Sequence, residues 1–406
     1  MFGRTRAGAA AVAALTIAAA APAEAGRKPL PNLRQAWVSA SASRVEAGAS
    51  LRARDAVKNA SRRKARRSAV GFYLSRDRRR SADDLHLAAF RRVPRLRPRR
   101  SSRGATHVGI PDSVAAGSYR LIACADPLDR IRERRERDNC AATKGTIEVV
   151  KPAATLLAAG DVADCGLEGD SATAALLAER AGTVAMLGDG AYPDGSPGEY
   201  ADCYDPTWGR VKARTRPVPG DHDYGTPGAA GYFAYFGAAA GQPGRGWYSY
   251  ELGEWHVVAL NSVCAGVGCG PGSAQIRWLE DDLASHPARC TLAYWHNPVQ
   301  SQGSEGGSGA MFTARDVLRE AGAELALGGD NHDYERFPAS GGLREFVVGT
   351  GGAKLHPFRS GEQSSEVRDA RTHGVLRLTL RGDGYDWRFI PVAGGSFTDS
   401  GGGDCH

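Results

Sequence analysis

Five short motifs, each directly after an apolar or β-prone run, dominate the second half of this 406-residue chain. Functional side chains of α/β domains gather at the carboxyl ends of strands, where such motifs would lie. One Gly-Asp pair is common in turns, but five strand-end motifs in a row restrict the fold far more. They are Gly160-Asp161-Val162-Ala163, Gly188-Asp189-Gly190-Ala191-Tyr192, Gly220-Asp221-His222-Asp223, Trp295-His296-Asn297-Pro298 and Gly328-Gly329-Asp330-Asn331-His332-Asp333-Tyr334-Glu335-Arg336.

The segments around the first two motifs predict an α/β domain. Apolar residues favour a strand over Thr155–Ala159, a helix over Ser171–Arg180 and a second strand over Thr183–Leu187. A carboxylate follows each strand. Strand, helix and strand in this order are typical of α/β architecture, and we expect this domain to span residues 152–406.

Residues 30–150 have a different pattern and predict an all-β sandwich. Short segments alternate apolar and polar residues, and arginine-rich stretches between them are expected to be loops. The expected strands are Ala36–Ser43, Ala69–Leu74, Gly104–Ile110, Gly117–Ala125 and Thr146–Val150.

The N-terminus and the cysteines indicate a secreted protein. Residues 1–25 combine a basic start, an alanine-rich apolar run and a small-x-small end, the pattern of a signal peptide. No later stretch reaches the ~20 apolar residues of a transmembrane helix. All eight cysteines follow residue 25, which favours disulfides. Cys264 and Cys269 are near enough in sequence to close a loop, and Cys124 with Cys140 could close one edge of the first domain.

Charge is divided unequally between the two domains. Between Arg27 and Lys151 there are 31 Lys or Arg against 12 Asp or Glu, and the remainder of the mature chain is acidic. Two interpretations stay open. The first domain contacts an anionic polymer or the cell wall, or arginine simply occupies its solvated faces.

Both domains resemble known families. Residues 30–150 resemble a CARDB-type, immunoglobulin-like adhesion module, a class of binding or spacing domain. The second domain resembles the calcineurin-like metallophosphoesterases, and Tyr192 places the resemblance in the purple acid phosphatase branch. The resemblance implies a four-layer αββα-type catalytic domain. The segments that carry the first resemblance are Gly71-Phe72-Tyr73-Leu74-Ser75, Gly117–Asp126 and Asp138-Asn139-Cys140, and the second also includes Tyr204–Arg210 and Pro391–Gly395.

The second resemblance implies a pair of metal ions. A bridging carboxylate suits Asp189, because its two oxygens can each bind a hard cation. A phenolate at Tyr192 favours Fe(III) in the first site, where it compensates for Ala163, a position at which many relatives have histidine. The first ion would be held by Asp161, Asp189, Tyr192 and His332, and the second by Asp189, Asp221, His296 and Asp330.

The expected second site departs from the family pattern twice. Asp221 replaces the usual asparagine and Asp330 replaces the usual histidine. Both changes add negative charge to the ligands of one ion, which is expected to be divalent (Mn, Fe, Mg or Zn). Such oxygen-rich, anionic ligands suit harder cations such as Mn²⁺, Mg²⁺ or Ca²⁺ better than Zn²⁺. Two other interpretations remain: a weakened site that repels phosphate, or a misassigned ligand, with Asp164 or Asp333 as the stand-in.

The resemblance implies a secreted phosphatase that hydrolyses phosphate monoesters, with diesters as a second class. A metal-bridging hydroxide would attack phosphorus, and His222 would protonate the leaving group as a general acid. Asp223 would orient the His222 imidazole and raise its pKa. The alternative is a wall- or polyanion-binding surface protein with a weakened metal site.

We also state what is expected of conspicuous residues outside the proposed metal ligands. The aromatic residues between Tyr232 and Phe236 are expected to pack in the core, and Arg336 either meets phosphate or pairs with a structural carboxylate. The glycine-rich segment Ser301–Gly309 is a candidate substrate lid. Four histidines outside the motifs are expected to be structural: His256, His286, His356 and His373.

Overall fold

The computed structural model describes residues 29–361 and 364–406, so the expected signal peptide lies outside the described residues. These residues form two compact units. The first comprises most of residues 29–147. The second comprises Glu148–His406 together with Arg44–Ser50 and Ile110–Ser118. Both units are rich in β-strands.

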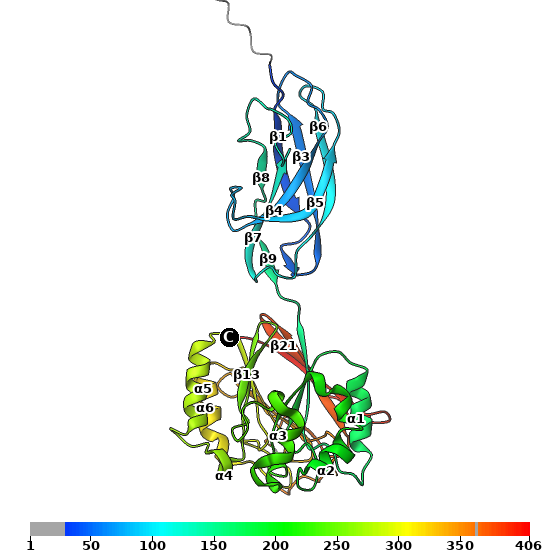
Figure 1. Ribbon diagram of the computed structural model, residues 1–406, viewed down its shortest axis with the longest axis vertical. Helices are drawn as coiled ribbons and strands as arrows, with labels where there is room; N and C mark the ends of the chain where they lie inside the picture. The colour runs from blue at the N-terminus through cyan, green and yellow to red at the C-terminus, as the bar shows by residue number, and fades with distance from the viewer. Residues whose placement is uncertain (1–28, 362–363) are drawn as a thin grey trace, which may run out of the picture. The chain divides into compact units, whose positions relative to one another are not determined.

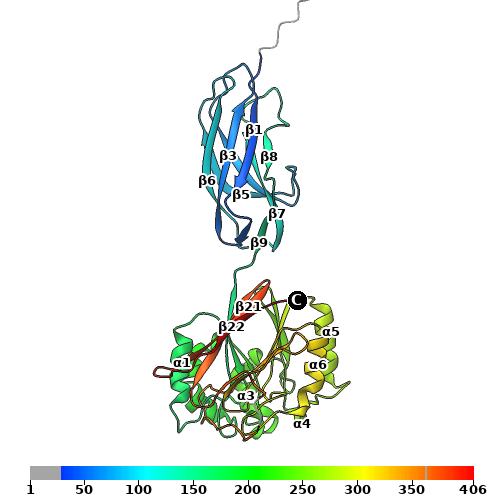
Figure 2. The ribbon, with the colours of Figure 1, turned by 180° about the vertical axis from the view of Figure 1, so that it is seen from behind.

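The first unit is built from antiparallel strands (Figures 1 and 2). Strands β1, β3 and β6 form one sheet in the order β1-β3-β6, and β4 pairs with β5 and β7 in a second sheet, where β8 pairs with β7. Strands β2 and β9, whose residues fall in the second unit except for Ile147, pair in parallel with one another. The bounds are β1 Leu33–Ala40, β2 Arg44–Glu46, β3 Ser50–Asn59, β4 Ser68–Ser75, β5 Leu85–Val93, β6 Ser101–Gly109, β7 Gly117–Ala125, β8 Cys140–Ala142 and β9 Ile147–Val150.

Two arginine-rich stretches that were expected to be loops are strands β3 and β5. In β3, Leu51 and Ala53 are buried while Arg52 and Arg54 point to solvent, the alternation of a half-buried strand. The charged residues Arg52, Arg54 and Lys58 occupy most outward positions of β3 and masked this pattern in the sequence. Arg91 of β5 turns inward and binds both carboxylate oxygens of Asp55 at 2.6 and 2.7 Å.

The second unit contains two mixed sheets. One has the order β12-β11-β10-β20-β21-β22, with β10, β11 and β12 parallel. The other has the order β13-β14-β15-β16-β18-β17-β19, with β14, β15, β16 and β18 parallel. The predicted strand Thr183–Leu187 is β11, and β10 begins one residue before the predicted one. The bounds are β10 Ala154–Ala159, β11 Thr183–Leu187, β12 Thr215–Val218, β13 Tyr248–Leu252, β14 Trp255–Ala259, β15 Cys290–Tyr294, β16 Leu325–Gly328, β17 Tyr334–Arg336, β18 Arg344–Val348, β19 Val367–Asp369, β20 Gly374–Arg381, β21 Gly384–Pro391 and β22 Ser400–Asp404.

Helices flank these sheets on opposite sides, with α5 and α6 on one side and α1 on the other (Figures 1 and 2). Helix α1 begins two residues before the predicted helix. The bounds are α1 Gly169–Ala178, α2 Pro197–Glu199, α3 Ala230–Phe236, α4 Cys264–Val267, α5 Ala274–Ser285 and α6 Phe312–Glu320, with short turns of other helix types at Tyr200–Tyr204, Trp208–Arg214, Asp223–Gly225, Pro227–Ala229, Gly237–Ala240 and Gly309–Met311.

Strand β14 shows how the second unit divides its core. Its successive side chains point to opposite faces of the sheet. Val257 packs in the large core shared by both sheets, whereas Val258 packs in a second core with Ile276 and Leu279 of α5. The sheet is therefore buried on both faces, which explains its continuous apolar strands.

Four disulfides pair all eight cysteines. The two pairs that sequence proximity favoured, Cys124–Cys140 and Cys264–Cys269, are present. The other two, Cys165–Cys203 and Cys290–Cys405, join residues that only the fold brings together. None of the helices within the described residues has the length and apolar character needed to cross a membrane.

Candidate metal centre

The five motifs meet beyond the carboxyl ends of parallel strands from both sheets. Strands β10 and β11 lead to Asp161 and Asp189, β15 leads to His296, and β16 leads to Asp330. The three aspartates have positive φ angles of 62°, 50° and 68°. Left-handed backbone is uncommon for residues with a Cβ and is concentrated at functional sites. Each loop thus turns sharply at its carboxylate.

The other three predicted ligands of the first ion surround the hydroxyl of Tyr192. This oxygen lies 3.0 Å from Asp161 Oδ1, 3.0 Å from Asp189 Oδ2 and 3.1 Å from His332 Nε2. The other ring nitrogen of His332 donates to the Lys354 carbonyl at 2.7 Å. That hydrogen bond leaves the Nε2 lone pair facing the cluster, the arrangement of a metal-binding histidine.

The predicted ligands of the second ion surround Nε2 of His296. This nitrogen lies 3.1 Å from Asp221, 3.3 Å from Asp189 and 3.7 Å from Asp330. It is fully buried and forms no hydrogen bond among the described residues, while Nδ1 donates to the Leu187 carbonyl at 2.8 Å. A buried lone pair facing three carboxylates is the donor set of a cation site.

The buried carboxylates repel one another, and bound cations would stabilise them. Burial and the neighbouring Asp189 raise the pKa of Asp161 to about 7, although His296 opposes the shift. Burial likewise raises the pKa of Asp330 to about 7, with Asp161 and Asp221 adding to the effect. Removing such charges from water is costly unless a cation is paired with them. The residues present therefore fit two metal ions.

His222 lies beside this cluster. Its backbone N–H donates to Asp189 Oδ1 at 3.0 Å, and its ring centroid lies 4.5 Å from that of Tyr192. Burial lowers the pKa of His222, but Asp189 and the Pro193 carbonyl outweigh it, so the net shift is upward.

Asp223 does not make the contact with His222 that the sequence predicted. Nδ1 of His222 instead lies 2.5 Å from the Pro193 carbonyl. Asp223 is buried and accepts hydrogen bonds from the Tyr200 hydroxyl at 2.6 Å and the Gly220 amide at 2.8 Å. Adjacent residues in this turn point to different sides, so Asp223 holds the motif loops together rather than orienting the imidazole.

The two alternative ligands considered for the second ion, Asp164 and Asp333, lie apart from both groups of proposed metal ligands. Asp164 accepts a hydrogen bond from the Gly166 amide in its own turn at 3.1 Å. Asp333 is buried, and burial together with Glu335 raises its pKa to about 9. Neither belongs to a group of potential ligands among the described residues, so Asp221 and Asp330 remain the better candidates.

Asn297, for which no role was expected, and His356, which was expected to be structural, both lie at this centre. The Asn297 amide donates to Asp330 and, at 3.4 Å, to Asp221. The His356 ring stacks on that of His332 with centroids 4.5 Å apart, and its Nδ1 lies 3.2 Å from Ser304 Oγ. Asn297 directly follows His296 in one of the five motifs, so its place at the site could have been predicted. Nothing around His356 in the sequence links it to the site.

Two nearby features have structural contacts, which for Arg336 is one of the two expected alternatives. Arg336 pairs with Asp399 at 2.7 Å and with Glu366. The segment considered as a lid is tied down, because the amides of Glu305 and Gly306 donate to Asn331 Oδ1 at 2.9 and 3.0 Å. The aromatic residues Tyr232, Phe233 and Phe236 are buried in the core, as expected.

Comparisons with known proteins agree with both resemblances. Residues 33–143 match the CARDB family model. This CARDB segment covers most of the first unit, and the predicted resemblance is confirmed. No curated protein matches the chain by sequence.

Solved structures share the fold at low identity. A purple acid phosphatase from seeds of yellow lupin (Lupinus luteus) has a TM-score of 0.51 at 14% identity, with 92% of this chain and 73% of that chain covered. GAP50 of Plasmodium, named as the anchor in the inner membrane complex, has a TM-score of 0.50 at 14% identity, with 61% of this chain and 88% of that chain covered. The chain following the CARDB segment therefore shares its fold with a purple acid phosphatase.

Proposed function

We propose that this protein is a secreted two-metal phosphatase that hydrolyses phosphate monoesters, with diesters as a second class of substrate. The observation that carries the proposal is the convergence of two ligand groups on the shared Asp189. We further propose that the CARDB segment is a sandwich and that the catalytic unit has four layers. The four disulfides support export from the cell.

Each ion would be held by four ligands, and Asp189 belongs to both groups. When bound, the two ions supply Lewis acidity toward the phosphate ester and lower the pKa of water. Asp221 has a side chain 55% exposed, so this edge of the centre is open to a substrate. The proposed ligands are Asp161, Asp189, Tyr192 and His332 for one ion, and Asp189, Asp221, His296 and Asp330 for the other.

His222 is the proposed general acid. The Pro193 carbonyl fixes its Nδ1, and Nε2 has no hydrogen-bond partner among the described residues, which leaves it available to the leaving oxygen. Asn297 adds a neutral donor between Asp221 and Asp330 and offsets part of their repulsion.

The ligand atoms of each group indicate which metal ion it would bind. A phenolate oxygen at Tyr192 favours Fe(III), and the more carboxylate-rich second group favours a harder divalent ion such as Mn²⁺ or Mg²⁺ over Zn²⁺. Asp221 and Asp330 thus alter the choice of metal rather than abolish the site.

Metal analysis combined with turnover tests the proposal. The tag-free protein is expected to retain two ions, to absorb visible light through a Tyr192–Fe(III) bond, and to hydrolyse para-nitrophenyl phosphate. Tyr192→Phe is expected to lose the absorption band. Tyr235→Phe is the control, since its hydroxyl contacts Asp205 outside the cluster.

The outcomes separate the parts of the proposal. Two bound ions without hydrolysis of either the monoester or bis(para-nitrophenyl) phosphate, under any supplied metal, would show that the phosphatase activity is wrong. A chain that binds no ion would overturn the metal centre as well. An active, colourless enzyme would exclude Fe(III) at Tyr192.

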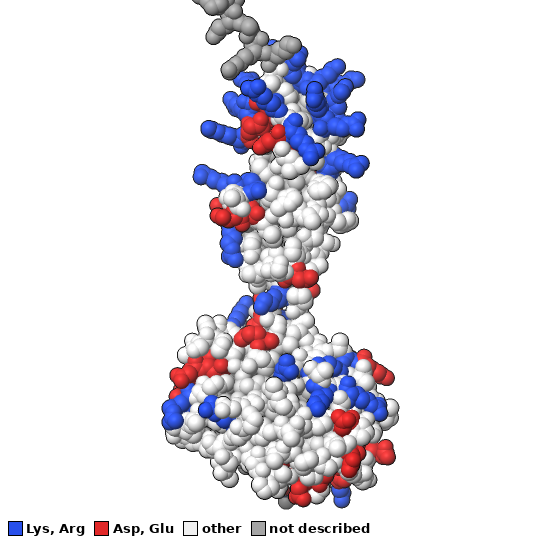
Figure 3. Space-filling view, viewed as in Figure 1, with Lys and Arg blue, Asp and Glu red and all other residues white. Residues whose placement is uncertain are grey.

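A second candidate function, polyanion binding, is favoured by one groove in the first unit. Lys and Arg side chains are numerous on this unit in Figure 3. A groove of about 740 Å³ is lined by Arg67, Arg92, Arg95 and Arg130, together with Leu128, which is 68% exposed. Such a groove attracts phosphate or sulfate groups of an anionic polymer.

A further inference from the structure

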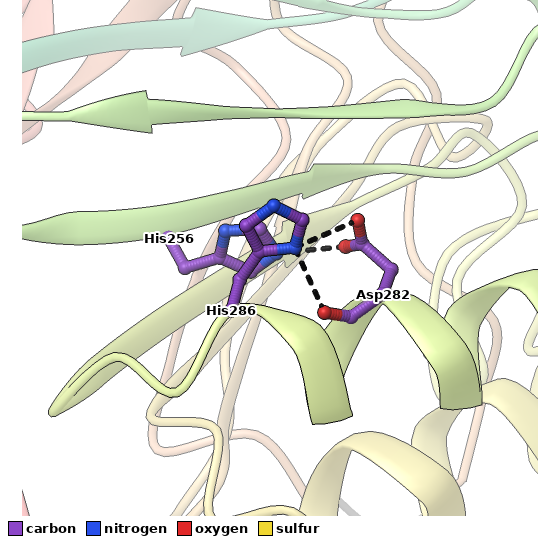
Figure 4. A group of neighbouring side chains, drawn as sticks. All are labelled: His256, Asp282 and His286. Atoms are coloured by element: carbon purple, nitrogen blue, oxygen red, sulfur yellow. Dashed lines mark hydrogen bonds and ion pairs between the residues drawn. The ribbon is translucent and has the colours of Figure 1, made fainter.

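Two histidines outside the five motifs meet at an aspartate of α5 (Figure 4). His256 is two residues before Val258 on β14, so its side chain points to the same face, toward α5. Asp282 lies on the inward stripe of α5, three residues after Leu279. His286 is the first residue after α5, four residues beyond Asp282, and its side chain returns to Asp282.

The ring nitrogens of both histidines face the Asp282 carboxylate. His256 Nε2 lies 2.8 Å from Oδ2, and His286 Nδ1 lies 3.2 Å from Oδ1. His286 Nδ1 also lies 2.9 Å from the Asp282 main-chain carbonyl, a hydrogen bond that a metal ion at Nδ1 would replace. The two rings are stacked, with centroids 5.0 Å apart and planes 9° apart. Two imidazole nitrogens and a carboxylate at this spacing are three ligands of a tetrahedral zinc site.

Glu251 completes the arrangement from the neighbouring strand. It is paired with His256 across β13 and β14, and its Oε1 lies 2.8 Å from His256 Nδ1. A metal-binding histidine commonly donates its second N–H to a carboxylate, which fixes the tautomer and makes the ligand more basic. Glu251 thus occupies the position of such a supporting carboxylate.

Burial and charge also fit a cation. The His256 side chain is 1% exposed, yet both of its nitrogens face carboxylates, so without a cation the ring must itself carry the positive charge. Ser249 Oγ donates to Asp282 Oδ1 at 2.8 Å and holds the carboxylate in place. The His286 side chain is 49% exposed, which gives an ion and a water ligand access from solvent.

We propose that His256, Asp282 and His286 form a binding site for a divalent transition-metal ion, Zn²⁺ in the first place, with Glu251 as its positioning residue. The site is separate from the candidate phosphatase centre. His256 lies near the amino end of β14, whereas the five motifs lie beyond the carboxyl ends of the strands. Its role is to fasten β13 and β14 to α5.

Zinc counting on the full, tag-free chain tests this site. The protein is stripped with a chelator, loaded with Zn²⁺ at mildly alkaline pH, dialysed and analysed for metal. His286→Ala is expected to retain one zinc ion fewer than the wild type, with its phosphatase activity unchanged. His107→Ala is the matched control, because it removes an exposed histidine of the first unit.

A second variant separates metal binding from packing. Glu251→Gln changes a side chain that is 56% exposed and is expected to weaken zinc affinity about 10- to 100-fold while leaving the ligands in place. Zinc is also expected to raise the melting temperature of the wild type more than that of His286→Ala.

Equal zinc content in the wild type and His286→Ala would overturn the proposal, as would an unchanged zinc affinity in Glu251→Gln. These outcomes do not depend on phosphatase activity. To keep the count independent of the candidate phosphatase centre, the measurement is repeated in an Asp189→Asn background, where the same one-ion difference is expected.

Discussion

At the scale of single residues, the candidate phosphatase centre depends on close approaches that only glycine permits. A Cβ at Gly188, where φ is 88°, would lie 2.5 Å from the His296 ring, and one at Gly220 would lie 2.0 Å from Asp189 Oδ1. Both are far inside normal contact distance. The glycines of the motifs thus leave room for the ligands that follow them.

Gly220→Ala is therefore expected to displace Asp189, the carboxylate shared by both ion groups. We expect loss of bound metal and a fall in kcat of about 100-fold or more, with the far-UV circular dichroism retained. Gly270→Ala is the control, because a Cβ there meets no atom within 4 Å. Normal metal content in Gly220→Ala would contradict the shared role of Asp189.

His222→Ala tests the proposed general acid through the leaving group. The loss of kcat is expected to reach about 100-fold for an alkyl phosphate, whose leaving oxygen needs a proton, and to be small for para-nitrophenyl phosphate. Equal losses on both substrates would point to a structural role. Metal content, measured in parallel, shows whether the ligand groups remain intact.

Glu133 of the first unit gives the stability a pH dependence. Burial raises its pKa from 4.5 to about 7, so the folded state binds this proton more tightly than the unfolded state. Its stabilising contribution is complete below about pH 4.5 and is lost as the pH rises through 7. Glu133→Gln, which stays neutral, is expected to be the more stable protein at alkaline pH, by on the order of 3 kcal/mol.

Chemical unfolding of the full chain at several pH values measures this difference. Asp83→Asn is the control, since Asp83 is an exposed residue of the same unit. A constant difference between Glu133→Gln and the wild type from acid to alkaline pH would show that Glu133 does not titrate in this way.

At the scale of elements, the disulfides differ in how much chain they enclose. Cys290 of β15 is joined to Cys405 at the C-terminus across 115 residues, whereas Cys264 and Cys269 enclose five. A cross-link across a longer segment removes more freedom from the unfolded chain.

Cys290→Ala with Cys405→Ala is expected to lower the free energy of unfolding by about 2–5 kcal/mol. Cys264→Ala with Cys269→Ala is expected to cost less, because the closed loop is short. Thermal unfolding of both double variants against the wild type checks the order. A larger loss for the short loop would contradict the loop-length argument for this fold.

At the scale of the whole molecule, charge separates the two units, the first strongly basic and the rest acidic. If the arginine groove binds polyanions, Arg67→Glu with Arg95→Glu in the full chain should elute from immobilised heparin at lower salt, and the salt dependence of binding should become shallower. Phosphatase activity is expected to stay unchanged. Elution at wild-type salt would contradict the groove and leave the solvated-arginine interpretation.

The sequence by itself determined the features that are local. Strand ends at Asp161, Asp189, His296 and Asp330, and the two short-range disulfides, could be predicted because each depends on neighbours in the chain. Strand β3 could not, because arginines at outward positions hid its periodicity. Strand β5 could not, because Phe90 points outward while the charged Arg91 turns inward. The helix α1 and strands β10 and β11 were placed within two residues.

Only the tertiary structure decided which distant groups meet. It brought His356 onto His332 and Asn297 between two aspartates, turned Asp223 away from His222, and placed His256 against the Asp282 and His286 of another element. These contacts depend on which face of a strand packs against which helix or loop. A one-dimensional pattern does not contain that information, because side chains far apart in sequence become neighbours only when the sheets and helices pack.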